Sequence, residues 1–297
     1  MADLFTRLTL GLLWLLSWLP LKVIGHLGDA FGSLLFLAVR PRRKVVLINL
    51  RLCFPELSDG ERKNLAKRHF QALARSILER GILWWQPEAR IRSLVRMEGR
   101  EHLEALLAAG RPVIMLCPHF LALDWAGARI AMDFEAASIY SHQKNALLDK
   151  MLLHGRSRFI KPVLLSRQDG MRGIVKVLKK GLPLYYLPDM DFGPQDAIFS
   201  PFFGVSAATI AGLPRLARLT NAVVLPTIAR ADEDGKGFSV TFDAPWPDYP
   251  GGDLQADVDR MNAYIESVVR SMPEQYYWVH KRFKTRPPGE TSFYDAG

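Results

Sequence analysis

A histidine and an aspartate lie five residues apart in the stretch "MLCPHFLALDWAG", at His119 and Asp124. The apolar run before His119 predicts a buried strand, and Asp124 falls near the expected start of a helix. Polar side chains just beyond a strand end are where α/β folds place reactive groups. A carboxylate that binds one imidazole nitrogen leaves the other nitrogen free as a base. The pair therefore predicts that His119, oriented by Asp124, removes a proton from a hydroxyl.

The spacing of this pair is not specific by itself, and a structural histidine with satisfied hydrogen bonds is the alternative. The sequence has no G-x-S-x-G motif, so it offers His119 no serine nucleophile. Cys117 lies two residues before His119, which leaves a thiol nucleophile open. Cys53 and Cys117 show no metal-binding spacing, and we expect both to be reduced core residues.

The elements around the pair alternate between strand and helix patterns, which predicts one α/β domain over residues 41–297. Strands are expected at 112–118, 134–141 and 182–189, with a hairpin around "DEDGKG" at 232–237. Helices are expected at 41–85, 103–109, 145–159, 171–181 and 256–272. Residues 201–222 are expected to form a loop followed by a helix.

The amino-terminal segment is strongly apolar. The unbroken part, residues 8–21, is shorter than the roughly 20 residues of a full membrane span. Trp14 and Trp18 are typical of a membrane interface, and the basic cluster at 40–44 favours anionic headgroups on the cytoplasmic side. We expect residues 1–40 to form a retained membrane anchor, either a tilted span or a helical pair in the interface. A pair of buried core helices is the alternative.

The formal net charge of the 297-residue chain is +9, which indicates an anionic partner. Acidic protein, anionic lipid and nucleic acid are the candidates, and a charge that only aids solubility is the alternative. The tail "PEQYYWVHKRFKTRP" mixes basic and aromatic residues, but no RNA- or DNA-binding motif accompanies it. We therefore expect no nucleic acid among the partners.

Several ordered blocks of the chain are similar to those of one enzyme family. "RPVIMLCPHFLALDWAG" resembles the first motif of the glycerolipid acyltransferase superfamily. Three later blocks, and the order in which they come, resemble the bacterial lipid A biosynthesis acyltransferases, the lauroyl/myristoyl transferase family. They are "SRQDGMRGIVKVLKKGLPLYYLPDMDFGP", "FSPFFGVSAATIAGLPRLARLTNAVVLP" and the carboxy-terminal tail. The resemblance extends to about Pro288, nearly the whole chain.

This resemblance implies a central mixed β-sheet flanked by helices and an acyl carrier protein as the fatty acyl donor. The implied acceptor is a hydroxyl of a hydroxyacyl chain on a Kdo-bearing lipid A precursor, an anionic glycolipid. The implied place is the cytoplasmic face of a Gram-negative inner membrane, in lipopolysaccharide biosynthesis, with no cofactor or metal. His119 would deprotonate the hydroxyl for direct attack on the thioester. Many family members carry Glu where this chain has Asp124.

Four further residues are candidates for substrate binding. By resemblance, Arg156 falls where the family keeps an arginine near the active site, and it could bind a phosphate or the thioester oxyanion. Arg158 lies two residues further along, and a solvated helix end is the alternative for both. Asp189 follows an expected strand and could hold Arg156 or a substrate sugar, or only form a turn. Arg282, in the basic tail, is expected to contact the anionic glycolipid.

Three other functions stay open at this point. One is acyl transfer to a lysophospholipid or another glycolipid. Another is a non-catalytic membrane-binding protein, and the third is a thioesterase in which water replaces the hydroxyl.

Overall fold

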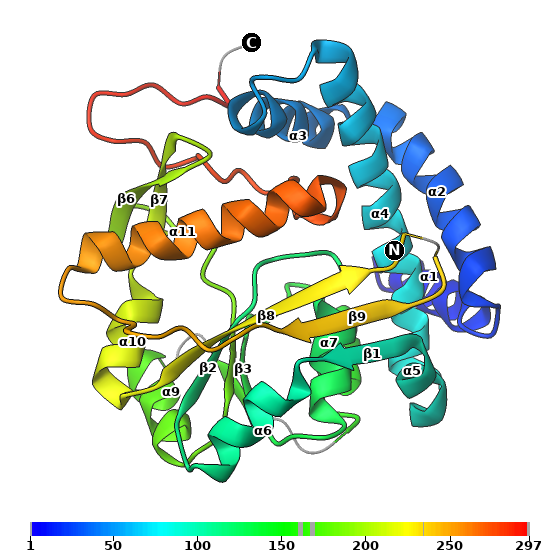
Figure 1. The fold of residues 1–297 in the computed structure, drawn as a ribbon. Helices are drawn as coiled ribbons and strands as arrows, with labels where there is room; N and C mark the ends of the chain where they lie inside the picture. The colour runs from blue at the N-terminus through cyan, green and yellow to red at the C-terminus, as the bar shows by residue number, and fades with distance from the viewer. Residues whose placement is uncertain (1, 160–162, 167–169, 234, 296–297) are drawn as a thin grey trace.

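The computed structural model describes residues 2–159, 163–166, 170–233 and 235–295. Within these ranges, seven strands form one mixed sheet in the order β1–β9–β8–β2–β5–β3–β4 (Figure 1). The pair β8–β9 is antiparallel, and the other neighbouring strands are parallel. The expected α/β fold with a central mixed sheet is confirmed. The strands are β1 (Val95–Glu98), β2 (Val113–Leu116), β3 (Ala137–Tyr140), β4 (Val163–Ser166), β5 (Leu184–Tyr186), β8 (Val223–Ala231) and β9 (Phe238–Phe242).

Helices cover both faces of this sheet (Figure 1). The alternation of side chains along β2 explains why both faces need a cover. Ile114 and Leu116 point into one apolar core, and Val113 and Met115 point into the other. The helices are α1 (Ala2–Leu16), α2 (Leu21–Ala38), α3 (Arg40–Cys53), α4 (Asp59–Trp85), α5 (Glu88–Leu94), α6 (Arg100–Ala108), α7 (Leu123–Ala131), α8 (Ala146–Arg156), α9 (Gly170–Lys179), α10 (Gly212–Thr220) and α11 (Leu254–Ser271), followed by the 3₁₀ turn η2 (Pro273–Gln275).

A second, two-stranded sheet replaces the loop expected in the first part of 201–222, so the loop is wrong, whereas the helix expected after it is confirmed as α10. Strands β6 (Ala197–Phe202) and β7 (Val205–Ile210) form an antiparallel hairpin. Its two-residue turn, Phe203–Gly204, has positive φ at both positions, 53° and 71°. This is the signature of a type I′ turn, in which Asn-Gly is the usual sequence. Because Phe203 occupies the first turn position, the sequence lacks the usual signal from which this hairpin could be predicted.

The long helix α4 is the support for the amino-terminal helices. It begins with a capping box, in which Ser58 accepts from the backbone N–H of Glu61 and the Glu61 carboxylate accepts from the backbone N–H of Ser58. Helix α2 lies along α4, and its Gly28 and Gly32 allow the two backbones to approach closely. Asp29 of α2 also forms an ion pair with Arg75 of α4. Helices α1 and α2 therefore pack directly on the rest of the chain, and the domain boundary at residue 40 stays a prediction.

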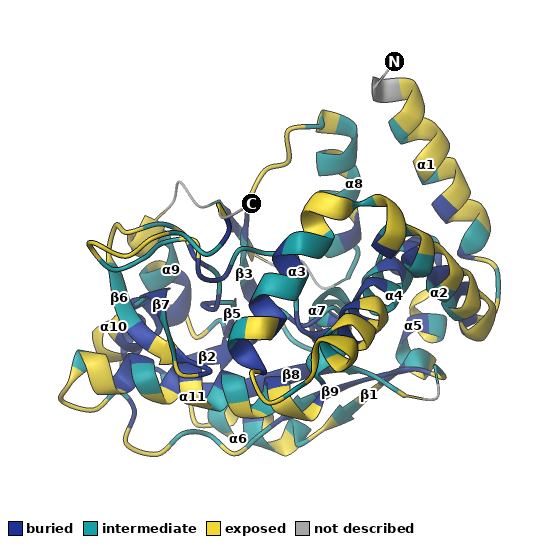
Figure 2. Ribbon diagram, turned by 90° about the horizontal axis from the view of Figure 1, so that it is seen from above, coloured by how far each residue is buried: buried dark blue, intermediate teal, exposed yellow. Residues whose placement is uncertain are grey.

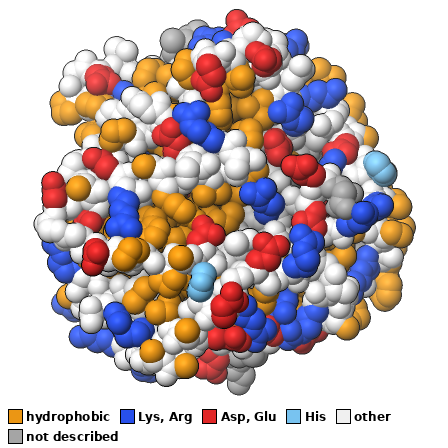
Figure 3. All heavy atoms as spheres, in the orientation of Figure 1, with side chains coloured by type: hydrophobic (Ala, Val, Ile, Leu, Met, Phe, Trp, Pro, Cys, Tyr) orange, Lys and Arg blue, Asp and Glu red, His pale blue; other side chains and the backbone are white. Residues whose placement is uncertain are grey.

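The outer sides of α1 and α2 are apolar and exposed (Figure 2). Hydrophobic side chains line the right-hand edge of the molecule in Figure 3, where α1 and α2 lie. In the part of the chain described here, α2 is the helix long and apolar enough to cross a bilayer, by length and composition only. This arrangement fits membrane association. The exposed side chains include Leu4, Phe5, Leu8, Leu12, Leu27, Phe31, Leu34 and Leu37.

Two glycines of α2 give a test of the packing between α2 and α4. A Cβ at Gly32 would lie 2.4 Å from the carbonyl oxygen of Phe70, whereas a Cβ at Gly25 would meet nothing within 4 Å. We expect Gly32→Ala to lower the free energy of unfolding by about 1–3 kcal/mol. Gly25→Ala should raise it by up to about 1 kcal/mol, because alanine is the better helix former. Urea denaturation in detergent, followed by circular dichroism, measures both. Equal stability of the two variants would contradict the close packing.

Candidate active site

His119 lies in the loop between β2 and α7, and hydrogen bonds to the carboxy-terminal segment fix that loop. The backbone N–H of Leu121 donates to the carbonyl of Gln275 at 2.8 Å. The backbone N–H of Tyr277 donates to the carbonyl of His119 at 3.0 Å. On the strand side, Cys117 N–H continues the ladder to the carbonyl of Tyr186 at 2.9 Å. The histidine is thus set by three backbone contacts rather than left on a free loop.

Asp189 holds His119 with both carboxylate oxygens. Its Oδ1 accepts from the imidazole Nδ1 at 2.6 Å, and its Oδ2 accepts from the backbone N–H of His119 at 2.8 Å. His119 follows β2 and Asp189 follows β5. Because these two strands pair in parallel, their carboxyl ends lie side by side and bring the two residues together. The side chain of Asp189 is 1% exposed, and that of His119 is 19% exposed. With Nδ1 bound, Nε2 is the nitrogen left to act as a base.

The charge on Asp189 is stabilised by the groups it binds. Burial by itself raises the pKa of this carboxyl. The charge of His119 and the hydrogen bonds from its ring and backbone outweigh burial, so the pKa of Asp189 lies below its ordinary value. Asp189 is therefore ionised at neutral pH. An ionised carboxylate can only accept a hydrogen bond, which places the proton of a neutral imidazole on Nδ1.

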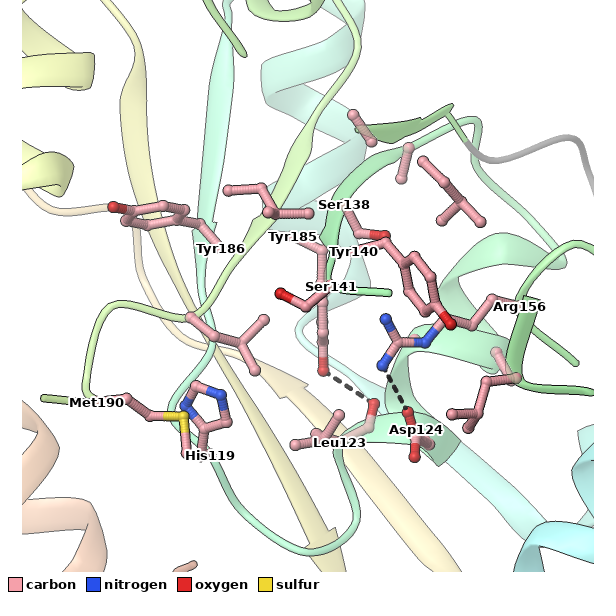
Figure 4. A pocket seen from close by; sticks show the side chains of 18 of the residues that line it. His119, Leu123, Asp124, Ser138, Tyr140, Ser141, Arg156, Tyr185, Tyr186 and Met190 are labelled. Carbon is pink, nitrogen blue, oxygen red and sulfur yellow. Dashed lines mark hydrogen bonds and ion pairs between the residues drawn. The ribbon is translucent and has the colours of Figure 1, made fainter. Parts of the chain in front are cut away.

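The prediction that Asp124 orients His119 is wrong, and so is the prediction that Asp189 holds Arg156. Asp124 lies in the first turn of α7, and its two oxygens bind Arg80 at 3.1 Å and Arg156 at 3.3 Å. Figure 4 shows His119 and Asp124 on opposite sides of Leu123, with Arg156 directed at Asp124. The start of α7 turns the carboxylate toward α4 and α8, away from the imidazole.

Arg80, Asp124 and Arg156 form one network at the side of the cavity that lies opposite His119. Burial raises the pKa of Asp124, but the two guanidinium groups outweigh burial and lower it overall. Arg156 also lies over the ring of Tyr140, 5.4 Å from its centre. The arginine side chains stay 37% and 35% exposed, so both can still meet a ligand. Two positive charges and one negative charge leave the network with a net charge of +1.

Two predicted substrate contacts, Arg158 and Arg282, have structural partners. Arg158 donates to the backbone carbonyls of Leu83 and Gln86, which ties the end of α8 to the end of α4. Arg282 is 2% exposed and donates to the carbonyl of Ala208 at 2.8 Å and to the hydroxyl of Thr209 at 2.8 Å. Because Arg282 is buried and bonded to protein acceptors, the prediction that it contacts the substrate is wrong. Arg158 is half-buried, and its contact with the substrate stays a prediction.

The two cysteines are free and buried, as expected. The thiol of Cys117 donates to the carbonyl of Met115, and burial raises its pKa well above the ordinary value. Since the thiolate is the reactive form, this environment disfavours a thiol nucleophile beside His119.

Sequence reasoning missed the residues that support the site from a distance. Asn49 of α3 donates to the carbonyls of Trp278 and His280, both at 2.8 Å. The Nε2 of His280 accepts from the backbone N–H of Asp191, just beyond Asp189. Burial and the charge of Arg282 lower the pKa of His280 to about 4, so it is a neutral acceptor. An isolated Asn inside an apolar helix is the signal in the sequence, because buried amides need partners.

A cavity of about 730 Å³ opens beside the base. His119, Asp124 and Arg156 line its polar part (Figure 4), and Arg80 lines it as well. The rest is largely apolar and includes Leu73, Ile77, Ile139, Leu164, Ile174 and Leu216. This volume is in the usual range for lipid-sized ligands, and an apolar wall suits an acyl chain.

A histidine whose Nδ1 is bound by a buried carboxylate lies at a largely apolar cavity and faces a pair of arginines, an arrangement that suits the activation of a hydroxyl or water beside a lipid chain. The model of the family described as bacterial lipid A biosynthesis acyltransferase matches residues 3–285. The chain belongs to this family, and its activity is acyl transfer in lipid A biosynthesis.

Individual relatives agree with the family assignment over nearly the full length. The lipid A biosynthesis lauroyltransferase of Escherichia coli K12 is 37% identical over 97% of this chain and 94% of that protein. The palmitoleoyltransferase of the same organism is 34% identical over 96% and 92%. Its myristoyltransferase is 32% identical over 92% and 83%. The solved 1-acyl-sn-glycerophosphate acyltransferase of Thermotoga maritima covers 85% of this chain and 97% of its own, with 14% identity and a TM-score of 0.38, too low to support a conclusion.

Exchanging each aspartate for asparagine in turn distinguishes the roles of Asp189 and Asp124. We expect Asp189→Asn to lower kcat by roughly 100- to 10,000-fold, because an amide no longer fixes the Nδ1–H tautomer. Asp124→Asn should keep the tautomer, because Asp189 still binds Nδ1. ¹⁵N NMR of labelled histidine reports the tautomer directly. A changed His119 tautomer in Asp124→Asn, with an unchanged one in Asp189→Asn, would reverse the assignment.

Proposed function

We propose that this enzyme transfers a fatty acyl chain from acyl carrier protein to a hydroxyl of a hydroxyacyl chain on a Kdo-bearing lipid A precursor. The observation that carries this proposal is the His119–Asp189 pair at the cavity, with Nε2 left to accept a proton. The acyl groups named in the family relatives support a fatty acyl substrate.

The reaction is a direct transfer without a covalent acyl-enzyme. Nε2 of His119 takes the proton of the acceptor hydroxyl as its oxygen attacks the thioester carbonyl. The carbon–sulfur bond then breaks, and the leaving thiolate takes the proton from the imidazolium. Asp189 stabilises the imidazolium that forms between these two steps, because its ionised carboxylate stays bound at Nδ1.

The Arg80–Asp124–Arg156 network is the anion-binding part of the site. Guanidinium groups bind phosphate with paired hydrogen bonds and also stabilise an oxyanion. The net charge of +1 suits an acceptor that carries phosphates and sugar carboxylates. Asp124 keeps both arginines in place, which gives it a positioning role rather than the orienting role predicted from the sequence.

Helices α1 and α2 place the enzyme at the membrane surface. We propose that they lie in the interface on the cytoplasmic face of the inner membrane and do not cross it. The inner side of α2 binds α4 through the Asp29–Arg75 ion pair and a hydrogen bond from Gln71 to Ser33 at 3.0 Å. A spanning α2 would draw this charged pair into hydrocarbon, which is costly. The exposed apolar sides of both helices instead match the headgroup boundary.

Product analysis tests the proposed reaction. Purified enzyme in detergent is incubated with a panel of acyl carrier protein thioesters and a tetra-acylated, Kdo-bearing precursor. We expect mass spectrometry to show a mass gain of one acyl group, and His119→Ala should abolish it because the base is lost.

Each alternative function gives a different result in this assay. If a lysophospholipid is acylated and the precursor is not, the acceptor is a lysophospholipid rather than a lipid A precursor. Free fatty acid formed at full turnover would indicate a thioesterase. A biological role that survives His119→Ala would indicate a non-catalytic membrane-binding protein.

Gly127 offers a test of the cavity as the acyl-chain site. It lines the cavity from α7, and a Cβ there would meet only the Tyr185 ring at 4.0 Å. Gly127→Leu therefore fills the cavity without a backbone clash. We expect transfer of the preferred chain to fall by about tenfold or more, with shorter chains less affected. Gly127→Ala is the matched control and should keep the chain preference. An unchanged preference in Gly127→Leu would place the acyl chain elsewhere.

A further inference from the structure

A groove on the outer surface of α9 combines an apolar floor with a cationic rim. Its volume is about 500 Å³. We refer to it as the α9 groove. The residues that line it are Met171, Arg172, Val175, Lys176, Lys179, Lys180 and Leu219, the last from α10.

The four cations of the α9 groove stand on one side of the helix. Arg172, Lys176 and Lys179 follow a spacing of four and three residues, which keeps them on neighbouring turns of one face, and Lys180 directly follows the end of the helix. All four are exposed, and among the described residues none of them has an ion-pair partner. A stripe of exposed positive charge attracts an anionic partner.

The floor of the α9 groove is apolar and reachable from solvent. Met171 is 41% exposed and Leu219 is 58% exposed. Single exposed apolar residues are ordinary, but here they lie between cations in a concave surface. This combination fits an amphipathic acidic helix, whose apolar side chains would enter the groove while its carboxylates meet the rim.

The α9 groove adjoins the active-site cavity. Met171 lines both of them, and Ile174, on the next turn of α9, lines the cavity. A partner bound in the groove is therefore placed beside the wall of the acyl-chain site. This position is useful to a protein that delivers a thioester to the cavity. It offers no such advantage to a free anion or a distant regulator.

We propose that the α9 groove is the docking site for an acidic helix of acyl carrier protein. This proposal rests on the proposed function, because it takes its partner from the proposed acyl donor. The docked carrier presents its thioester to His119 across the edge formed by Met171.

The position of the α9 groove favours a carrier protein over the bilayer as its occupant. Helices α1 and α2 lie at one end of the molecule and α9 lies at the other, in both Figure 1 and Figure 2. With the exposed apolar sides of α1 and α2 in the membrane interface, the cationic rim stands away from that contact. It is then open to a soluble partner.

Charge reversal on α9 tests the docking site. The variant carries Arg172→Glu, Lys176→Glu and Lys179→Glu, which lowers the formal net charge from +9 to +3. The matched control carries Lys63→Glu, Lys67→Glu and Arg111→Glu, three exposed cations elsewhere, with the same change of net charge. Binding of holo acyl carrier protein is measured by fluorescence anisotropy, and transfer kinetics are measured in detergent without anionic lipid. Acyl-pantetheine serves as a donor without the carrier.

We expect the α9 variant to raise the Kd and KM for the carrier by on the order of tenfold, with kcat at saturation unchanged. Its kinetics with acyl-pantetheine should equal those of the wild type, and the control should bind the carrier normally. Added salt should weaken wild-type binding more than binding by the variant.

Normal carrier binding by the α9 variant would overturn the docking site and leave the proposed reaction intact. Wild-type enzyme that neither binds the carrier nor accepts its thioester would overturn the proposed donor, and the docking site with it. If the α9 variant binds the carrier normally but loses affinity for anionic vesicles, the groove serves the membrane instead.

Discussion

One buried carboxylate, Asp189, determines where the candidate base, His119, lies. Taking a charge out of water costs several kcal/mol unless its oxygens are fully bonded. Here both oxygens bind His119, one at the ring and one at the backbone. Ring, loop and strand end are therefore fixed by the same group. The arrangement depends on the parallel pairing of β2 with β5, which aligns Leu116 with Tyr186 and brings the two following loops to one edge of the sheet.

The carboxy-terminal segment connects this edge to the amino-terminal helices. On one side it binds the His119 loop through the carbonyl of Gln275. On the other side its carbonyls accept from Asn49 of α3, and the Glu274 carbonyl lies 3.0 Å from His69 Nδ1 of α4. Burial lowers the pKa of His69 to about 4, so it is a neutral partner there. Helices α3 and α4 and the loop that carries His119 are thus held by the same carboxy-terminal segment.

The sequence predicts those parts of the molecule that depend on local pattern. Strands β2 and β5 are continuous apolar runs, and His119 stands out because it follows the first of them. Strand β1, "VRME", carries alternate charges at the sheet edge and has no such signal. The role of Asp189 could not be read from spacing, because it lies 70 residues from His119 and meets it only once β5 enters the sheet beside β2. Arg80 is one of several charged residues on a long helix, and nothing local distinguishes it.

The separation of the two aspartates has an electrostatic reason. Arg80 and Arg156 approach the same carboxylate, and without Asp124 between them their like charges would repel. If Asp124 turned to His119 instead, that balance would be lost, and Asp189 would remain buried with an unbonded oxygen. The observed pairing avoids both the repulsion between the two arginines and an unbonded oxygen on Asp189. It also separates the two polar parts of the cavity, because the His119–Asp189 pair lies on one side and the network with its net positive charge lies on the other. A Glu at position 124 would keep the charge that such a network requires.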